Sequence, residues 1–576
     1  MKAGLLIGAA LLLTACMPRS SKPATSDANF TGFVDEYFAS YFAFYPTQGS
    51  AAGLHDYDSK LEDFSNLRMR DRVSDIRGQN ARLQTLMDGK LSEDNAIDAA
   101  ILDGQLQSEI QELDVLRTWR KNPLFYLTVV GDSIDVLMKR NFAPQRDRLL
   151  LVNERLLKMR ALLDSMRDNV NEPPPEFTYL ASRITRGAVE YFRDTVPTWA
   201  KAAAGHDDGL ASLFRSANRK VITDLQVLED YFRTDLKTLS GGDFAIGSEA
   251  FANKLRYEEM IDIPLDKLLA IGEDNLRKDR EAFVAVARRA APGRSPSEAM
   301  KALSGNHPNE QELLAGAEGI LENLRQFVVD KKILNLPSSG RPKVAETPPF
   351  LRAGIFAAMD SPGAYEDKAT EAFYYLTPTE SGWTPEHKEE HLRLFNRPVM
   401  NIISIHEVFP GHFSQFLYSS QFPTKTRKLI SANSNAEGWA HYAEQMMVDE
   451  GFGGSDPKTR LAQLSEALLR DCRYVVGMKL HTQKMTVEEG ANVFVQQCFQ
   501  QPANALEEAR RGTYDPTYLY YTAGKLQILK LREDYRQKLG GTYSLSKFHD
   551  AFIEQGPIPI AMVRKLMLGS DSGPVL

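Results

Sequence analysis

The chain has 576 residues, a formal net charge of −7 and a pI near 5.9, and 43% of its residues are hydrophobic. A chain of this length can bury a large core and can form more than one lobe. The acidic balance leaves no global basic excess, so the composition argues against a nucleic-acid partner.

The N-terminus has the pattern of an export signal. Lys2 precedes an apolar run over residues 5–13, which is too short for an ordinary membrane-spanning helix. The sequence Leu-Thr-Ala-Cys that ends at Cys16 resembles a bacterial lipoprotein signal, in which this cysteine becomes the lipidated first residue. We therefore expect a signal peptide over residues 1–15 and a flexible, Ser/Pro/Thr-rich tether over residues 16–28. A cleaved signal that releases a soluble protein is the alternative.

The residue after the cysteine indicates the membrane. Residue 17 is Met and not the Asp associated with inner-membrane retention, so we expect the protein at the periplasmic face of an outer membrane. One acyl chain anchors a protein only marginally, whereas two chains hold it stably, and the lipoprotein resemblance implies two. No second long apolar run follows, so no segment beyond the N-terminus is expected to span a membrane.

Amphipathic helices are predicted for most of the first half. Over residues 61–166 and 210–239, apolar residues recur at three- and four-residue spacing among charged ones. The clearest stripe consists of Leu149, Val152, Leu156, Met159 and Leu163. The segment Asn-Glu-Pro-Pro-Pro at 171–175 interrupts the pattern and predicts a corner or linker. We expect a helical N-terminal region over residues 29–345.

The composition changes after Val344, where Pro and Gly residues separate short apolar pieces. Residues 371–377, Glu-Ala-Phe-Tyr-Tyr-Leu-Thr, have the aromatic content and the length of a β-strand. We expect residues 346–576 to carry the candidate site, on helices beside a small sheet. This boundary marks composition only.

An inverted zinc motif, H-x-x-E-H, is formally present between His387 and His391. Both histidines lie in the highly charged stretch 386–393, which is more typical of a solvated helix face. We therefore place the metal site elsewhere.

The main candidate site begins with the heptapeptide H-E-V-F-P-G-H over residues 406–412 and continues at Glu437. Catalytic zinc takes three protein ligands, often His, His and Glu, and keeps a fourth position for water. An adjacent Glu can accept the proton of that water and pass it to the leaving amine. These residue types indicate a hydrolytic zinc site, with His406 and His412 as ligands and Glu407 as the base.

The spacing of the two histidines requires a break in the helix. In an H-E-x-x-H helix the histidines are about 40° apart around the axis, whereas at i and i+6 they are about 120° apart. Pro410 lacks an N–H and clashes with the carbonyl four residues earlier, and Gly411 tolerates unusual dihedrals. We expect the helix to break there, at a cost of about 3 kcal/mol that metal binding can offset. An ordinary turn after a helix end is the alternative.

Glu437 opens a second helix-like stretch over residues 436–448, after the cap-forming pair Ser434-Asn435. The motif H-E-x-x-P-G-H followed by E-G-W-A-x-Y-x-E, here over 437–444, resembles the DUF885 family of bacterial lipoproteins, which looks distantly related to the gluzincin metallopeptidases. Further matching segments near both ends, 53–58 and 548–559, extend the resemblance over nearly the whole mature chain. It implies a mainly α-helical, metallopeptidase-like fold with a small β-sheet beside the active-site helix, and a cleft walled in part by the helical first half.

The resemblance also implies roles for individual residues. His406, His412 and Glu437 become the zinc ligands and Glu407 the base. Tyr521, in a Tyr-x-x-Gly pattern, becomes a candidate catalytic donor to the oxyanion, a role whose loss can cost about 2.7–4 kcal/mol. The alternative for Tyr521 is simple packing with a satisfied hydroxyl.

Three more residues are candidates for the surroundings of the site. His441 and Glu444 lie one and two turns beyond Glu437 on the same helical face, so either could orient a ligand, and His441 could even replace one. His481 could line the cleft, although the Asp and Gly that precede the corresponding His in many relatives are missing here. An ordinary core histidine is the alternative for His481.

Two features stay open at this point. By the gluzincin resemblance, the strand at 371–377 could hold a peptide substrate by strand addition, or it could belong to a small structural hairpin. Cys472 and Cys498 could pair in an oxidising periplasm or stay free and buried. No C-x-x-C array supports thiolate binding of zinc.

We therefore expect a lipid-anchored periplasmic zinc peptidase in which a metal-activated water attacks a peptide carbonyl. A lipoprotein that keeps the scaffold for binding or envelope assembly, without turnover, is the alternative from another class. The presence of Glu407 favours catalysis, because a purely structural metal site has no use for a base. A zinc hydrolase of non-peptide amides or esters is the second alternative.

Overall fold

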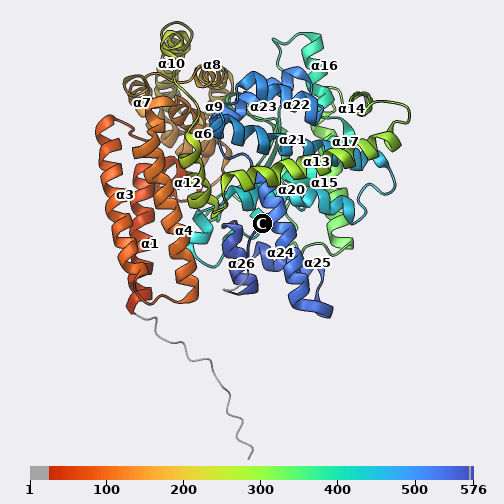
Figure 1. The fold of residues 1–576 in the computed structure, drawn as a ribbon. Helices are drawn as coiled ribbons and strands as arrows, with labels where there is room; N and C mark the ends of the chain where they lie inside the picture. The colour runs from red at the N-terminus through yellow and green to blue at the C-terminus, as the bar shows by residue number, and fades with distance from the viewer. Residues whose placement is uncertain (1–24, 570–572) are drawn as a thin grey trace, which may run out of the picture.

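The computed structural model describes residues 25–569 and 573–576, which form a mainly α-helical protein with one small sheet (Figure 1). The expected signal peptide and the lipidation site, Cys16, lie outside the described residues. The first helix, α1 (Thr25–Phe44), begins within the tether predicted over 16–28, so residues 25–28 are helical and not a flexible linker.

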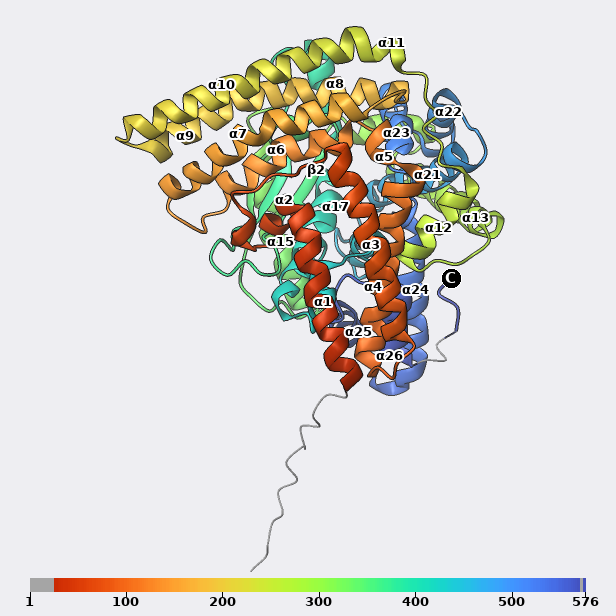
Figure 2. The same ribbon diagram turned by 90° about the vertical axis from the view of Figure 1, so that its left-hand side faces the viewer.

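The first hydrophobic core is built almost entirely by helices of residues 25–239. The helices of this region are α1, α2 (Pro46–Ala51), α3 (Asn66–Met87), α4 (Glu93–Ile110), α5 (Thr118–Lys121), α6 (Leu124–Lys139), α7 (Gln145–Asn169), α8 (Pro175–Glu190), α9 (Val196–Ala204), α10 (Asp208–Tyr231) and α11 (Lys237–Leu239). In Figure 2, α1, α3 and α4 stand side by side and α6, α7, α8 and α10 form a second group that extends across their upper end.

The apolar stripe predicted for residues 149–163 explains how α7 enters this core. Each of its five members is at most 3% exposed. The predicted corner is also confirmed, because α7 ends at Asn169 and α8 begins at Pro175. Periodicity and proline position therefore determine this part of the fold.

The second hydrophobic core is built mainly by the remaining helices. Those that contribute buried residues to it are α13 (Leu265–Ala290), α14 (Pro296–Leu303), α15 (Leu313–Asp330), α17 (Arg397–Glu407), α18 (His412–Phe416), α20 (Asn433–Asp449), α21 (Pro457–Thr482), α22 (Val487–Cys498), α23 (Pro502–Tyr514), α24 (Tyr520–Leu539), α25 (Leu545–Ile553) and α26 (Ile560–Leu568). The other three are α12 (Gly247–Glu259), whose Phe251 and Leu255 belong to a separate small cluster, α16 (Pro385–Leu394) and α19 (Lys425–Leu429). Because α13 to α15 contribute to this core, the composition change near residue 345 lies inside it and does not separate the two cores.

The sheet has three strands, β1 (Lys343–Glu346), β2 (Ala357–Asp360) and β3 (Phe373–Leu376), in the order β1-β3-β2. The pair β1–β3 is parallel and the pair β2–β3 is antiparallel, with Tyr374 opposite both Val344 and Met359. The hydroxyl of Tyr374 lies 3.2 Å from Ser404 Oγ, so the sheet packs beside α17 as expected.

The strand predicted at 371–377 is confirmed as β3, but its proposed role in strand addition is wrong. Both edges of β3 are already paired, one with β1 and the other with β2, so no backbone edge is left for a peptide. The aromatic content that identified the strand reflects its central position, where both faces pack.

A disulfide joins Cys472 on α21 to Cys498 at the end of α22, with a Cα–Cα distance of 6.4 Å. The two cysteines are therefore paired and not free. Over the described ranges, no helix is both long enough and apolar enough to cross a membrane.

Candidate metal centre

The candidate site begins at the C-terminal end of α17. The side chain of Asn396 accepts the backbone N–H of Val399 at the helix start, and His406 and Glu407 are the last two helical residues. Val408 leaves the helical region at φ −119° and ψ −80°, and the next helix, α18, begins at His412. The chain therefore breaks at the Pro-Gly pair, as the sequence predicts.

Gly411 makes the return of the chain possible. Its N–H donates to the carbonyl of Ile405 over 3.0 Å, and a Cβ at this position would lie only 1.7 Å from the carbonyl oxygen of His406. Only glycine fits such a close approach. The ring centroids of His406 and His412 are consequently 4.9 Å apart, with their planes at 88°.

The second half of the site comes from α20, which carries Glu437 near its N-terminal end. The indole N–H of Trp439 donates to the carbonyl of Pro410 over 2.8 Å and so ties α20 to the turn between the histidines. In the E-G-W motif, the glutamate therefore faces the histidines while the tryptophan holds the backbone that carries them.

Glycines let α20 and α24 cross in contact. A Cβ on Gly438 would lie 2.5 Å from Gly524 Cα, and a Cβ on Gly524 would lie 1.9 Å from the carbonyl oxygen of Ser434. This close crossing brings Tyr521, one turn before Gly524, toward the histidines. Its ring centroid is 6.2 Å from that of His406.

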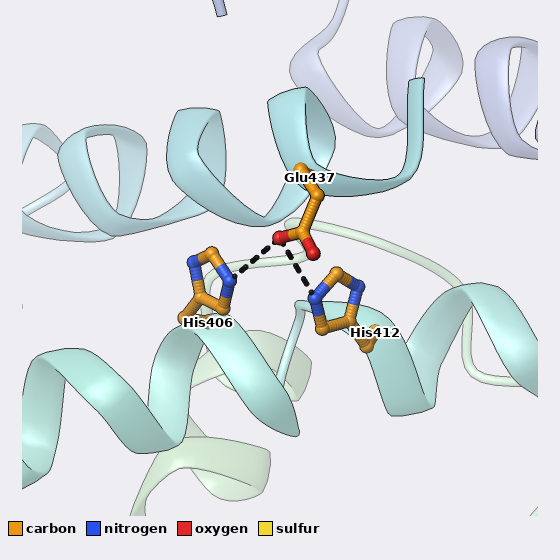
Figure 3. A group of neighbouring side chains, drawn as sticks. All are labelled: His406, His412 and Glu437. Atoms are coloured by element: carbon orange, nitrogen blue, oxygen red, sulfur yellow. Dashed lines mark hydrogen bonds and ion pairs between the residues drawn. The ribbon is translucent and has the colours of Figure 1, made fainter. Parts of the chain in front are cut away.

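His406, His412 and Glu437 converge on one point, with the carboxylate between the two imidazoles (Figure 3). Glu437 Oε2 lies 3.1 Å from His406 Nε2 and 3.3 Å from His412 Nε2. Tetrahedral zinc with ligands at about 2.0–2.2 Å separates its ligand atoms by about 3.3–3.5 Å. Among the described residues this is the one group of three or more His, Cys, Asp or Glu side chains whose ligand atoms gather in this way.

The side chain of His406 is 5% exposed, whereas those of His412 and Glu437 are 21% and 24% exposed, so the cluster is open to solvent on one side. Burial disfavours the charged imidazole, but hydrogen bonds to Glu437 and Glu444 outweigh it and raise the pKa of His406 to about 9. Burial likewise opposes ionisation of Glu437, but the two histidines hold its pKa well below the usual value. The site therefore stabilises the negative charge of the Glu437 carboxylate between two imidazole rings.

Buried Glu444 orients His406 from behind. Its Oε1 accepts the Nδ1–H of His406 over 2.7 Å, and Arg470 lies 3.4 Å from the same oxygen. Its Oε2 accepts from His441 Nδ1 over 3.1 Å. Although burial opposes ionisation, Arg470 and then His441 lower the pKa of Glu444. Since Glu444 engages Nδ1, it is Nε2 of His406 that faces Glu437, the orientation that metal-binding histidines adopt.

A family model described as "Bacterial protein of unknown function (DUF885)" matches residues 46–567. The chain belongs to the DUF885 family. The match includes both motifs of the candidate site and the segments near the two ends that carried the resemblance in the sequence.

Two solved structures share the fold of this DUF885 protein. A "putative lipoprotein of unknown function" from Shewanella oneidensis is 26% identical, with a TM-score of 0.74 over 95% of this chain and 100% of that one. A "putative lipoprotein" from Colwellia psychrerythraea is 18% identical, with a TM-score of 0.75 over 94% of this chain and 98% of that one, which shows a common fold alone. No curated protein matches the chain.

The other candidate residues of the DUF885 protein lie at different distances from the cluster. Glu407 is 8% exposed, and no described side chain or backbone group hydrogen-bonds to its carboxylate, so it remains free as an acceptor. The hydroxyl of Tyr521 accepts an N–H of Arg511 over 3.2 Å, which leaves its own proton available. His441 bonds to Glu444 and does not belong to the ligand group, so it has the place of an orienting residue.

The structure does not bring the remaining histidines to the cluster. Nε2 of His481 lies 2.7 Å from the carbonyl of Gly512, and its ring packs near Phe244 and Phe251, as in an ordinary core histidine. In the inverted motif, Nε2 of His391 lies 2.7 Å from the carbonyl of Thr377. Its partner His387 stacks on Trp383.

Glu259 supports the site and was not predicted from the sequence. At the end of α12, its carboxylate accepts the backbone N–H groups of Asn433 over 3.1 Å and Ser434 over 2.8 Å, and so caps the helix that carries Glu437. Burial raises the pKa of Glu259 to about 7. A single Glu in a helical pattern gives no sequence signal for such a contact.

Proposed function

We propose that this DUF885 protein is a zinc-dependent peptidase, held by lipid at Cys16 on the periplasmic face of a bacterial outer membrane. The convergence of His406, His412 and Glu437, with Glu407 beside the first ligand, carries the proposal. The nitrogens of His406 and His412 face the carboxylate of Glu437, and this donor set is one that catalytic zinc takes when it replaces the protons shared between these groups. The distant likeness to gluzincin peptidases belongs to the same proposal.

When bound, zinc polarises the substrate carbonyl and lowers the pKa of water to about 7. Glu407 takes the proton of the attacking water and delivers it to the leaving amine. Tyr521 donates to the oxygen on which negative charge develops. Glu444 fixes the ring of His406 throughout, because it holds the Nδ1 proton.

The lipid anchor rests on the N-terminal pattern. The description of each of the two similar solved proteins as a "putative lipoprotein" supports it. Mass spectrometry of the protein from membranes tests this part, since diacylation at Cys16 adds a defined mass and a Cys16→Ala variant should lack it.

Elemental analysis and one substitution test the chemistry. Purified protein should contain about one zinc per chain, the number that one three-ligand site holds. Glu407→Gln should retain that zinc and lose hydrolysis of a broad peptide library by about 10²–10⁴-fold, because only the proton acceptor is removed. His412→Ala should lose the zinc itself.

Assays of zinc-loaded wild-type protein distinguish a peptidase from its two alternatives. Zinc-loaded wild-type protein that leaves every peptide intact would contradict the peptidase. In that case, cleavage of amide or ester probes would indicate a different hydrolase, and inertness toward all of them would indicate a binding lipoprotein.

A further inference from the structure

Three arginines surround the ring of Tyr521, and two of them pair closely with carboxylates. Arg473 donates from Nε and Nη2 to both oxygens of Glu508, over 2.7 and 2.8 Å. Arg470 donates to the carboxylate of Glu466 and lies beside Glu444. Their guanidinium groups stack 5.3 and 5.8 Å from the ring of Tyr521 and have structural roles.

The third arginine, Arg511 on α23, is engaged differently. One N–H donates to the hydroxyl of Tyr521, and the nearest carboxylate, Asp515, is 3.6 Å away, beyond hydrogen-bond distance. None of the described residues accepts from its Nε or Nη1, and the side chain is 26% exposed. Arg511 therefore has free, solvent-accessible donors.

We propose that Arg511 binds the free C-terminal carboxylate of the substrate, so that the enzyme removes residues from the C-terminus of peptides. This inference rests on the proposed function and specifies its substrate class. A planar guanidinium with free N–H groups matches a carboxylate in charge and in geometry. Asp515 holds the guanidinium in place from the side, and it also accepts the hydroxyl of Tyr520 over 2.8 Å.

The distances limit how many residues are released. Arg511 Nη2 lies 3.2 Å from the hydroxyl of Tyr521. In the proposed mechanism, this hydroxyl donates to the scissile carbonyl. Since one extended residue spans at most about 3.6 Å, a carboxylate on Arg511 belongs to the first or second residue after the scissile bond. Water adds to the carbonyl carbon, the C–N bond breaks, and the amine leaves with a proton from Glu407. The product is a free amino acid or a dipeptide.

The test compares a library of free-acid peptides with the same peptides carrying C-terminal amides, using zinc-loaded enzyme and mass spectrometry of the products. We expect amidation to lower kcat/KM by about 10- to 100-fold, the effect of losing a charge-assisted hydrogen bond. Arg511→Gln should remove this preference, and Arg511→Lys should restore part of it.

A matched control lies next to Arg511 on the same helix. Arg510 pairs with Glu507 and stacks on Tyr179, so Arg510→Gln should keep the preference for free acids. Binding gives a second readout. In equilibrium dialysis, Glu407→Gln protein should retain free-acid peptides better than amides, and adding Arg511→Gln should abolish the difference.

The outcomes distinguish this inference from the proposed function. Equal cleavage of acids and amides by the wild type, or an unchanged preference in Arg511→Gln, would overturn the role of Arg511 and leave the peptidase intact. No cleavage of either library would overturn both.

Discussion

The first core and the second core both bury polar side chains, but they satisfy them in different ways. In the first core, the Nη1 group of Arg148 on α7 donates to three backbone carbonyls over 2.7–3.1 Å, and Nε donates to a fourth. In the second core, His406 Nε2 and His412 Nε2 face the carboxylate of Glu437. One arrangement is complete within the chain, whereas the other brings together two imidazoles and a carboxylate whose shared protons a cation can replace.

This difference distinguishes buried polar groups that stabilise the fold from buried polar groups that can bind a ligand. A buried group with all its partners in the protein stabilises the fold. A cluster of imidazoles and a carboxylate that converges at a solvent-exposed point can also bind a ligand, which then stabilises the folded state. Substitutions in the two cores should therefore affect different measurements.

Arg148→Met should give the largest effect, and on stability alone. It leaves several buried carbonyls without a donor, each costing about 1–3 kcal/mol, so we expect the unfolding free energy to fall by about 3 kcal/mol or more. Differential scanning calorimetry measures the change. Zinc content of the folded protein should stay near one per chain. Loss of zinc without a lower Tm would contradict the distinction between the two cores.

Tyr521→Phe should affect activity alone. Removing the donor to the oxyanion should lower kcat by about 10²–10³-fold, or about 2.7–4 kcal/mol, while zinc content and Tm stay close to wild type. Tyr520→Phe is the matched control, because its hydroxyl bonds to Asp515 instead. Equal effects from the two substitutions would show that Tyr521 only packs.

Glu259 makes a smaller contribution to the free energy of unfolding, and this contribution depends on pH. Burial raises its pKa from 4.5 in the unfolded chain to about 7, so between these values the folded state holds a proton that the unfolded state releases. Its contribution to stability is full below pH 4.5 and is lost as pH rises through 7, by up to about 1.4 kcal/mol per pH unit.

Thermal unfolding of zinc-saturated protein from pH 5 to pH 8 measures this contribution of Glu259. Glu259→Gln should flatten the fall in Tm with rising pH, whereas Glu249→Gln, at an exposed position on the same helix, should not. Coincident profiles of wild type and Glu259→Gln would show that the cap on α20 does not titrate in this range.

Local signals made the helices and the centre of the site predictable. The stripe on α7 follows from spacing alone, and Pro410 with Gly411 predicted the break that turns His412 toward His406. These features need only the geometry of a few consecutive residues, so a sequence contains them.

Long-range contacts could not be predicted in this way. The strands β1 and β2 have four residues each and no clear alternation, so the central place of β3 depends on tertiary packing. Glu259 and Arg511 reach the site from other helices, and His481 packs away from it. No spacing rule links residues that approach each other only in the folded chain.

The most direct test of the account is a crystal structure of zinc-loaded protein with diffraction data on both sides of the zinc absorption edge. We predict one strong anomalous difference peak at about 2.0–2.2 Å from His406 Nε2, His412 Nε2 and Glu437 Oε2. Zinc-saturated crystals without a peak at this point, or with the peak on other residues, would contradict the central claim.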